Sequence, residues 1–85
     1  MTTMMLKDRL KYLYELIHGW DNYDGKKITD ISILVAEKYL VNNFTEKEIE
    51  TIYIYPMPSG GVQIEYFDVS GDVEIEIYDY DITIF

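Results

Sequence analysis

The chain has 85 residues, no cysteine and a formal net charge of −9, and 48% of its residues are hydrophobic. This length allows one domain with a modest core, and the hydrophobic content is that of a globular rather than a disordered protein. The lack of cysteine excludes disulfides and thiolate metal sites. No uncharged apolar run is long enough to cross a membrane, and the N-terminus lacks a signal-peptide pattern. We therefore expect a cytoplasmic protein.

The charge is distributed unevenly along the chain. Residues 1–40 contain six basic and six acidic side chains, whereas residues 41–85 contain one basic and ten acidic side chains. Affinity for phosphate requires clustered lysine and arginine, so direct binding to nucleic acid or to an acidic membrane surface is disfavoured. The charge favours a protein partner with a basic surface.

The first part of the chain predicts a helix over about residues 4–18, because apolar residues recur there at helical spacing. Gly19 stands where a glycine commonly ends a helix. The main apolar positions of this helix are Leu6, Leu10, Leu13 and Ile17. The following segment, residues 19–25, is dense in turn-forming residues. Its aromatic residues Trp20 and Tyr23 either hold the loop against the core or serve as anchors for a partner. We expect Trp20 to be largely buried.

A second helix is predicted over about residues 31–42, with Thr29 or Asp30 as its N-cap. Its apolar stripe begins at Ile31, Leu34 and Val35, is interrupted by Lys38, and resumes at Tyr39 and Leu40. Residues 46–50 form an acidic connector that has room for one further helical turn.

From Thr51 the hydrophobic period changes to two, which predicts strands over about residues 51–55, 62–67, 72–78 and 82–85. We therefore expect a single α+β domain over residues 1–85. Its two N-terminal helices pack on one face of a mostly antiparallel four-stranded β-meander. Valine and isoleucine form the face toward the helices, and carboxylates and tyrosines form the other face.

The predicted pairing of the two central strands places carboxylates opposite each other. Glu65 faces Glu76 if the loop is residues 70–71, or Glu74 if the loop is residues 68–71. Either arrangement is destabilising by roughly a few tenths of a kcal/mol. The strand residues expected to be buried are Val62, Ile64, Val73, Ile75 and Ile77. They lie under the first helix, which carries Leu6, Leu10, Leu13 and Ile17.

Two segments resemble a widespread, functionally uncharacterised family of small bacterial proteins. They are GWDNYDGKKIT at residues 19–29 and PMPSGGVQIEY at residues 56–66, followed by the alternating acidic strand DVEIEI. The chain departs from the family pattern in having Gly25 for the usual alanine and Tyr66 for the usual tryptophan. The resemblance implies an architecture and no activity. It also implies that a recurring set of residues belongs together, namely Trp20, Asp21, Tyr23, Gly60, Gly61 and Glu65.

The sequence contains no catalytic constellation. The single histidine, His18, lies at a helix end, where its imidazolium favours the helix dipole. Glu65 with Glu74 or Glu76 is a candidate acid–base pair, but on an open sheet face without a pocket. Asp21, Asn22 and Asp24 lack the spacing of a calcium loop and are more typical of a turn. We predict no enzyme activity, no metal and no cofactor.

The leading functional hypothesis is a small acidic protein-binding module that occupies a basic surface of a nucleic-acid-handling partner, as a mimic of DNA charge. Phage and mobile-element inhibitors, anti-CRISPR proteins among them, have similar size and charge. The alternatives are a housekeeping or toxin–antitoxin-associated interaction domain whose acidity only gives solubility, and a small hydrolase. The oligomeric state is left open. The predicted partner-binding residues are Glu65, Glu74, Glu76, Asp72, Tyr78, Asp79, Tyr80, Asp81, Trp20 and Tyr23.

Overall fold

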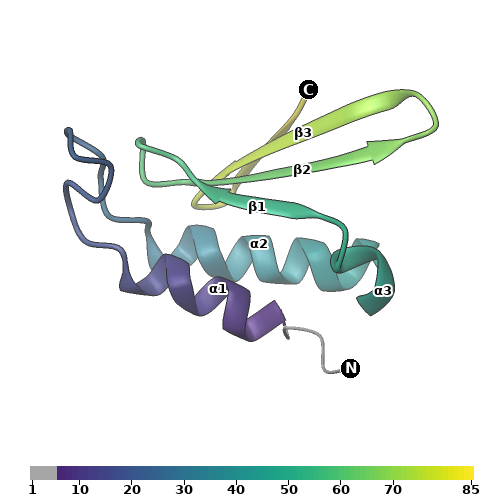
Figure 1. Cartoon of the computed structure of the whole chain (residues 1–85), viewed down its shortest axis with the longest axis horizontal. Helices are drawn as coiled ribbons and strands as arrows, with labels where there is room; N and C mark the ends of the chain where they lie inside the picture. Colours follow the sequence, from purple (N-terminus) through teal and green to yellow (C-terminus); the bar gives the residue numbers. More distant parts are fainter. Residues whose placement is uncertain (1–5) are drawn as a thin grey trace.

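The computed structural model describes residues 6–85 as three helices followed by four strands. The helices are α1 (Leu6–Glu15), α2 (Asp30–Asn43) and the single turn α3 (Glu46–Ile49). The strands are β1 (Tyr53–Pro56), β2 (Val62–Asp68), β3 (Gly71–Tyr78) and β4 (Asp81–Ile84). The strands form one antiparallel sheet in the order β1-β2-β3-β4. The helices lie on one side of this sheet (Figure 1), which confirms the predicted α+β meander.

Side-chain N-caps determine where α2 and α3 begin. The Thr29 hydroxyl accepts a hydrogen bond from the Ser32 backbone N–H and begins α2, as predicted. Thr45 and Glu48 form a reciprocal capping box at α3, so the acidic connector does contain a helical turn. Arg9 of α1 donates through its guanidinium to the backbone carbonyls of Ile49 and Ile52, which ties α1 to the segment that leads into β1.

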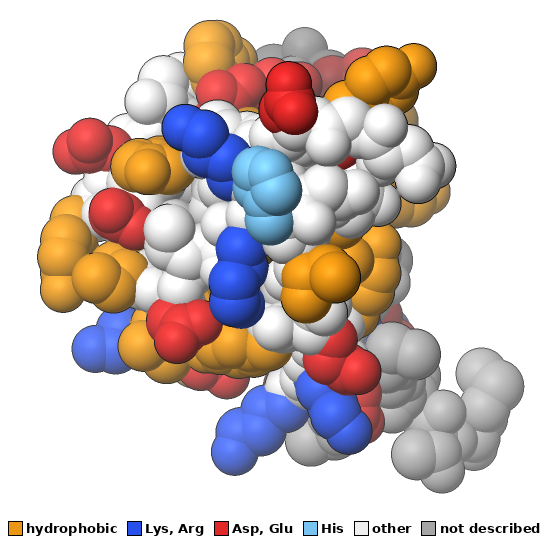
Figure 2. Space-filling model, turned by 90° about the vertical axis from the view of Figure 1, so that its left-hand side faces the viewer, with side chains coloured by type: hydrophobic (Ala, Val, Ile, Leu, Met, Phe, Trp, Pro, Cys, Tyr) orange, Lys and Arg blue, Asp and Glu red, His pale blue; other side chains and the backbone are white. Residues whose placement is uncertain are grey.

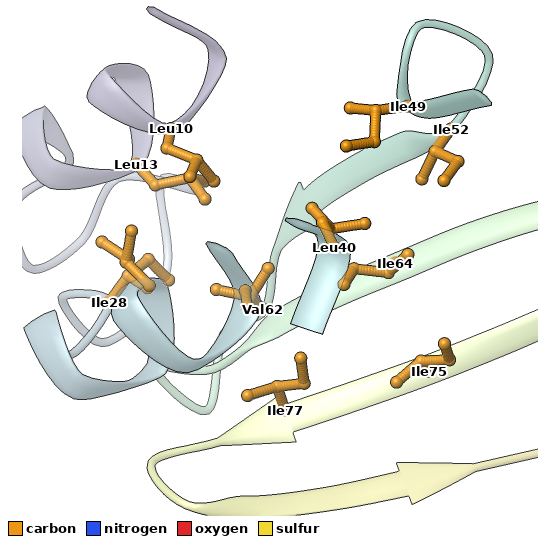
Figure 3. Packing of buried hydrophobic residues seen from close by; sticks show 12 residues of the cluster. Leu10, Leu13, Ile28, Leu40, Ile49, Ile52, Val62, Ile64, Ile75 and Ile77 are labelled. Carbon is orange, nitrogen blue, oxygen red and sulfur yellow. The ribbon is translucent and has the colours of Figure 1, made fainter. Parts of the chain in front are cut away.

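The core lies between the sheet and the two long helices (Figure 3). Helix α2 contacts β2 and β3, whereas α1 packs mainly against α2. The sequence analysis was therefore wrong in taking α1 as the main cover of the sheet. The buried hydrophobic residues are Leu10, Leu13, Ile28, Ile33, Ala36, Leu40, Ile49, Ile52, Val62, Ile64, Ile75 and Ile77.

Several predicted core positions are wrong. Helix α1 ends at Glu15, so Ile17 falls in the following loop and is 72% exposed; residues 4 and 5 of the predicted helix lie outside the described residues. In α2 the buried side chains include Ile33, Ala36 and Leu40, whereas Ile31 and Leu34 are exposed. This helix carries apolar residues on two sides. The predicted stripe is wrong at Ile31 and Leu34, whereas its member Leu40 is buried and Val35 and Tyr39 pack against the edge of the core. Val73, predicted as buried, is half-buried.

The register of β2 and β3 places Ile64 opposite Ile75 and Glu65 opposite Glu74. The second of the two predicted carboxylate pairings is thus confirmed. The loop, however, consists of residues 69–70, because Asp68 pairs with Gly71. Asp68 closes this loop by accepting hydrogen bonds from the backbone N–H and the hydroxyl of Ser70. These two bonds hold the pKa of Asp68 below its usual range.

Candidate functional site

The outer face of the sheet, the one away from the helices, is the candidate site. Its residues form rows across the strands. One row runs from Tyr53 through Glu65 to Glu74, and the next runs from Tyr55 through Gln63 and Glu76 to Thr83. These residues alternate along the strands with the buried Ile64, Ile75 and Ile77, so they point away from the core. We call Glu65, Glu74 and Glu76 together the acidic face.

The carboxylates of the acidic face are close neighbours. Residues directly opposite in an antiparallel pair have Cβ atoms about 4.5–5.5 Å apart, which applies to Glu65 and Glu74. The amide of Gln63 donates to the Glu74 carboxylate at 3.2 Å, which is the only side-chain hydrogen bond to the acidic face within residues 6–85. All three glutamates are half-buried by their neighbours.

Aromatic residues surround the acidic face. The rings of Tyr53 and Tyr55 stack on β1 with centroids 6.1 Å apart and an interplanar angle of 6°. Phe67 lies at one end of β2, opposite Asp72, and Tyr78 lies at the far end of β3, opposite Asp81. All four aromatic side chains are exposed. Exposed aromatic residues, tyrosine among them, are enriched at protein-binding surfaces.

A shallow depression of about 400 Å³ adjoins the acidic face near the loop between β1 and β2. Glu76, Tyr78 and Asp81 line it on the sheet side, and Lys26 and Met57 line it on the loop side. The two carboxylates and the tyrosine ring on the sheet side suit the head of an arginine or lysine side chain, while Lys26 on the loop side offsets part of their negative charge.

Two predicted binding residues in the turn between β3 and β4 do not join this face. The Asp79 backbone N–H donates to the Ser32 hydroxyl at 2.7 Å, and the Asp79 carboxylate accepts from the Thr29 hydroxyl at 2.6 Å. The Thr29 and Ser32 hydroxyls are 2.5 Å apart, so the hydrogen bonds form a closed ring. Asp79 thereby attaches the turn to the start of α2. Tyr80 is exposed and lines a groove beside α2. The sequence did not reveal this ring, because its members are up to 50 residues apart.

The two segments that carry the family resemblance meet at one end of the molecule (Figure 1). The Lys26 backbone N–H donates to the Pro58 carbonyl, and the Thr29 backbone N–H donates to the Gly60 carbonyl, both at 2.9 Å. The loop of residues 19–25 is closed by Asp21, whose carboxylate accepts from the backbone N–H groups of Tyr23 and Gly25 at 3.0 Å. A turn is thus confirmed for Asp21.

The aromatic residues of this loop differ in their surroundings. Trp20 packs against the core and donates its indole N–H to the Lys26 carbonyl at 2.8 Å. It is half-buried rather than largely buried as predicted. Tyr23 is 83% exposed. This end of the molecule mixes basic, acidic and hydrophobic side chains (Figure 2), in contrast to the acidic face. Trp20 and Tyr23 come from this end and not from the sheet.

Trp20→Ala is expected to lower the free energy of unfolding by about 1–3 kcal/mol, because it removes a half-buried ring and the indole hydrogen bond. The melting temperature should fall by several degrees in a domain of this size. Thermal unfolding followed by circular dichroism measures this, and Tyr23→Ala is the control. An unchanged melting temperature for Trp20→Ala would contradict a structural role of the indole.

The single histidine and the candidate metal ligands remain to be placed. His18 is exposed in the loop after α1. Residues 6–85 contain no group of three or more histidine, aspartate or glutamate side chains arranged to hold a metal ion. No helix in the described part of the chain is long and apolar enough to cross a membrane.

Comparisons with protein-family models, with curated proteins and with solved structures find no match to this chain.

Proposed function

We propose that the chain is a binding protein whose acidic face docks on a basic surface of a protein partner. The observation that supports this proposal is the cross-strand placement of Glu65 opposite Glu74, with Glu76 on the same face. Like charges opposite each other in a sheet destabilise the fold by a few tenths of a kcal/mol or more. A basic surface on a partner attracts both carboxylates, and this attraction offsets their mutual repulsion.

The surroundings of the acidic face support a protein partner. Tyr53, Tyr55, Phe67 and Tyr78 offer rigid contact area at low cost in side-chain entropy. The depression beside Glu76 offers a position for one basic side chain of the partner. Together they supply the aromatic contacts and charge complementarity that protein interfaces use for affinity and rate of association.

Nucleic-acid-handling proteins are the partner class that this surface favours, because their basic grooves bind phosphate. Neighbouring residues on one face of a strand are about 6.7 Å apart and neighbouring strands about 4.8 Å apart. The acidic face is therefore less densely charged than duplex DNA, which carries one charge per about 1.7 Å of axis. Competition with nucleic acid then depends on the tyrosine contacts as well as on charge.

The test compares two variants of equal net charge. Glu65→Gln/Glu74→Gln/Glu76→Gln removes the charge of the acidic face. Glu15→Gln/Glu46→Gln/Glu50→Gln removes the same charge from exposed positions on and beside α1 and α3. Each tagged protein is used to capture partners from an extract of the source cells, and the captured protein is then studied by binding kinetics.

We expect the wild type and the α1/α3 variant to capture the same basic protein, and the acidic-face variant to associate with it about tenfold or more slowly. The wild-type association rate should fall with ionic strength, and the acidic-face variant should show a weaker fall. Added duplex DNA should displace the wild type if the partner uses its nucleic-acid site. Equal association of both variants would mean that the acidic face serves only solubility, as the alternative hypothesis states.

A further inference from the structure

A second surface lies on the other side of the sheet, at its β4 edge. A groove of about 650 Å³ runs between α2 and β4. Lys38 is its single charged lining residue among residues 6–85, although the chain contains 16 acidic residues. The remaining lining residues are apolar, aromatic or amide side chains, namely Ile31, Leu34, Val35, Tyr39, Asn42, Asn43, Tyr80 and Ile82.

This groove explains the two misassigned apolar positions of α2. Ile31 and Leu34 are exposed because they face the groove rather than the core. On the β4 side, Ile82 and Ile84 pair with the buried Ile77 and Ile75, and therefore point toward the helix side of the sheet. They nevertheless remain 41% and 61% exposed, because none of the helices within residues 6–85 reaches over β4 to cover them.

The backbone of β4 is also open on its outer side. The Phe85 N–H donates to the Glu74 carbonyl at 2.9 Å, so this opposed pair is a hydrogen-bonded one. Bonded and non-bonded pairs alternate along an antiparallel ladder, which makes Ile84 and Ile82 non-bonded toward β3. Their N–H and C=O groups therefore point away from the sheet, toward a strand that residues 6–85 do not supply.

The two edge strands, β1 and β4, differ in how well they are protected against pairing with a strand of another chain. On β1, Pro56 limits pairing because proline lacks an N–H. Strand β4 contains no proline and no lysine, and its helix-side residues are isoleucines. The ring of hydrogen bonds from Asp79 to Ser32 and Thr29 holds the start of β4 against α2. The open edge is thus a fixed part of the fold.

We propose that the β4 edge binds the β4 edge of a second copy of this chain, in antiparallel orientation, to form a two-fold symmetric dimer. Ile82 of one copy pairs with Ile84 of the other, and each such pair exchanges N–H···O=C hydrogen bonds through the outward backbone groups. Thr83 meets Thr83 of the second copy at the two-fold axis, which is a favourable cross-strand pair. Asp81 faces Phe85 of the second copy, so no like charges are opposed.

A second copy of the chain matches both the apolar groove and the open backbone edge of this surface. The groove requires an apolar strand with free backbone groups, and β4 itself is such a strand. Ile84 of the second copy lies beside Ile82, next to the groove that Leu34 and Tyr39 line. A two-fold axis makes both copies bury the same patch, as in most homodimers. The acidic residues of β2 and β3 lie on the opposite sheet face, so their repulsion is not focused at this contact.

This dimer does not depend on the function proposed for the acidic face. The experiment therefore measures self-association directly. Analytical ultracentrifugation of the full chain over a range of concentrations should give a monomer–dimer equilibrium. Ile84→Lys places a charge on the helix side of the edge strand and should raise the dissociation constant at least about tenfold. Ile17→Lys makes the same change at an exposed isoleucine in the loop after α1 and should leave it unchanged.

A cross-link tests the register without altering the apolar patch. The chain has no cysteine, so Thr83→Cys introduces a single thiol. Non-bonded antiparallel pairs have Cα atoms about 4.5 Å apart, within the range of a disulfide. Thr83→Cys should form a disulfide-linked dimer on mild oxidation, and Asp81→Cys should not. A chain that stays monomeric at all concentrations would overturn the proposal, as would a dimer that Ile84→Lys does not weaken, or cross-linking by Asp81→Cys alone.

Discussion

Ile75→Ala is expected to lower the free energy of unfolding by about 2–5 kcal/mol. Ile75 lies on the central strand β3, is fully buried, and has Ile64 on one neighbouring strand and Ile84 on the other. Its side chain lies in the core with Ile64 and Leu40 (Figure 3), so truncation to alanine leaves a cavity between the sheet and α2. A domain of this length has a total stability of only about 4–13 kcal/mol, so the loss is a large share of it.

Urea denaturation followed by circular dichroism measures this loss as a shift of the transition midpoint at constant slope. Val69→Ala is the matched control, because Val69 is fully exposed in the loop between β2 and β3. The control should change the free energy of unfolding by no more than about 0.5 kcal/mol. If Ile75→Ala behaved like this control, Ile75 would not belong to the core and the strand register would have to be revised.

The sheet could be predicted from the sequence because its signals are local. Valine and isoleucine alternate with glutamate along β2 and β3, and glycine or proline stands at the strand ends. A shift by one residue would expose every isoleucine of a strand, so the pattern determines which residues face the helices. The same reasoning places Glu65 and Glu74 together on the outer face, which is the part of the candidate site that the structure assembles as expected.

The helices could be predicted less well, because their burial depends on distant partners. Helix α2 has apolar residues on two sides, and periodicity alone does not decide between Ile33 and Leu34. The sheet decides it, since α2 rests on β2 and β3 through the side that carries Ile33. Ile17 continues the periodic pattern of α1, but the helix ends at Glu15 before reaching it.

The contacts that join distant loops could not be predicted. They use backbone groups, as between Thr29 and Gly60, or short hydroxyl side chains, as between Ser32 and Asp79. Neither leaves a periodic signal in the sequence. The resemblance of two segments to one family indicated only that they belong together. Their hydrogen bonds to each other hold the segment after α1 against the loop after β1.

Gly61→Ala is expected to destabilise the fold by about 3 kcal/mol or more, because it overpacks a site that cannot relax. A Cβ atom at Gly61 would overlap the backbone carbonyl of Ile77 and the end of the Met57 side chain. Met57 is flexible and can move, but Ile77 lies on β3 and is paired with both Val62 and Ile82. The strand would have to shift, and its hydrogen bonds to the start of β2 would weaken.

Hydrogen exchange together with thermal unfolding tests this expectation. Gly61→Ala should lower the melting temperature by about 10 °C or more and increase exchange first at Val62 and Ile77, where β2 and β3 separate from the new side chain. Ser59→Ala is the control, because Ser59 is exposed in the same loop. Normal stability of Gly61→Ala would show that β3 does not approach Gly61 closely. Close packing of this loop on the sheet would then not be the reason for a glycine at position 61.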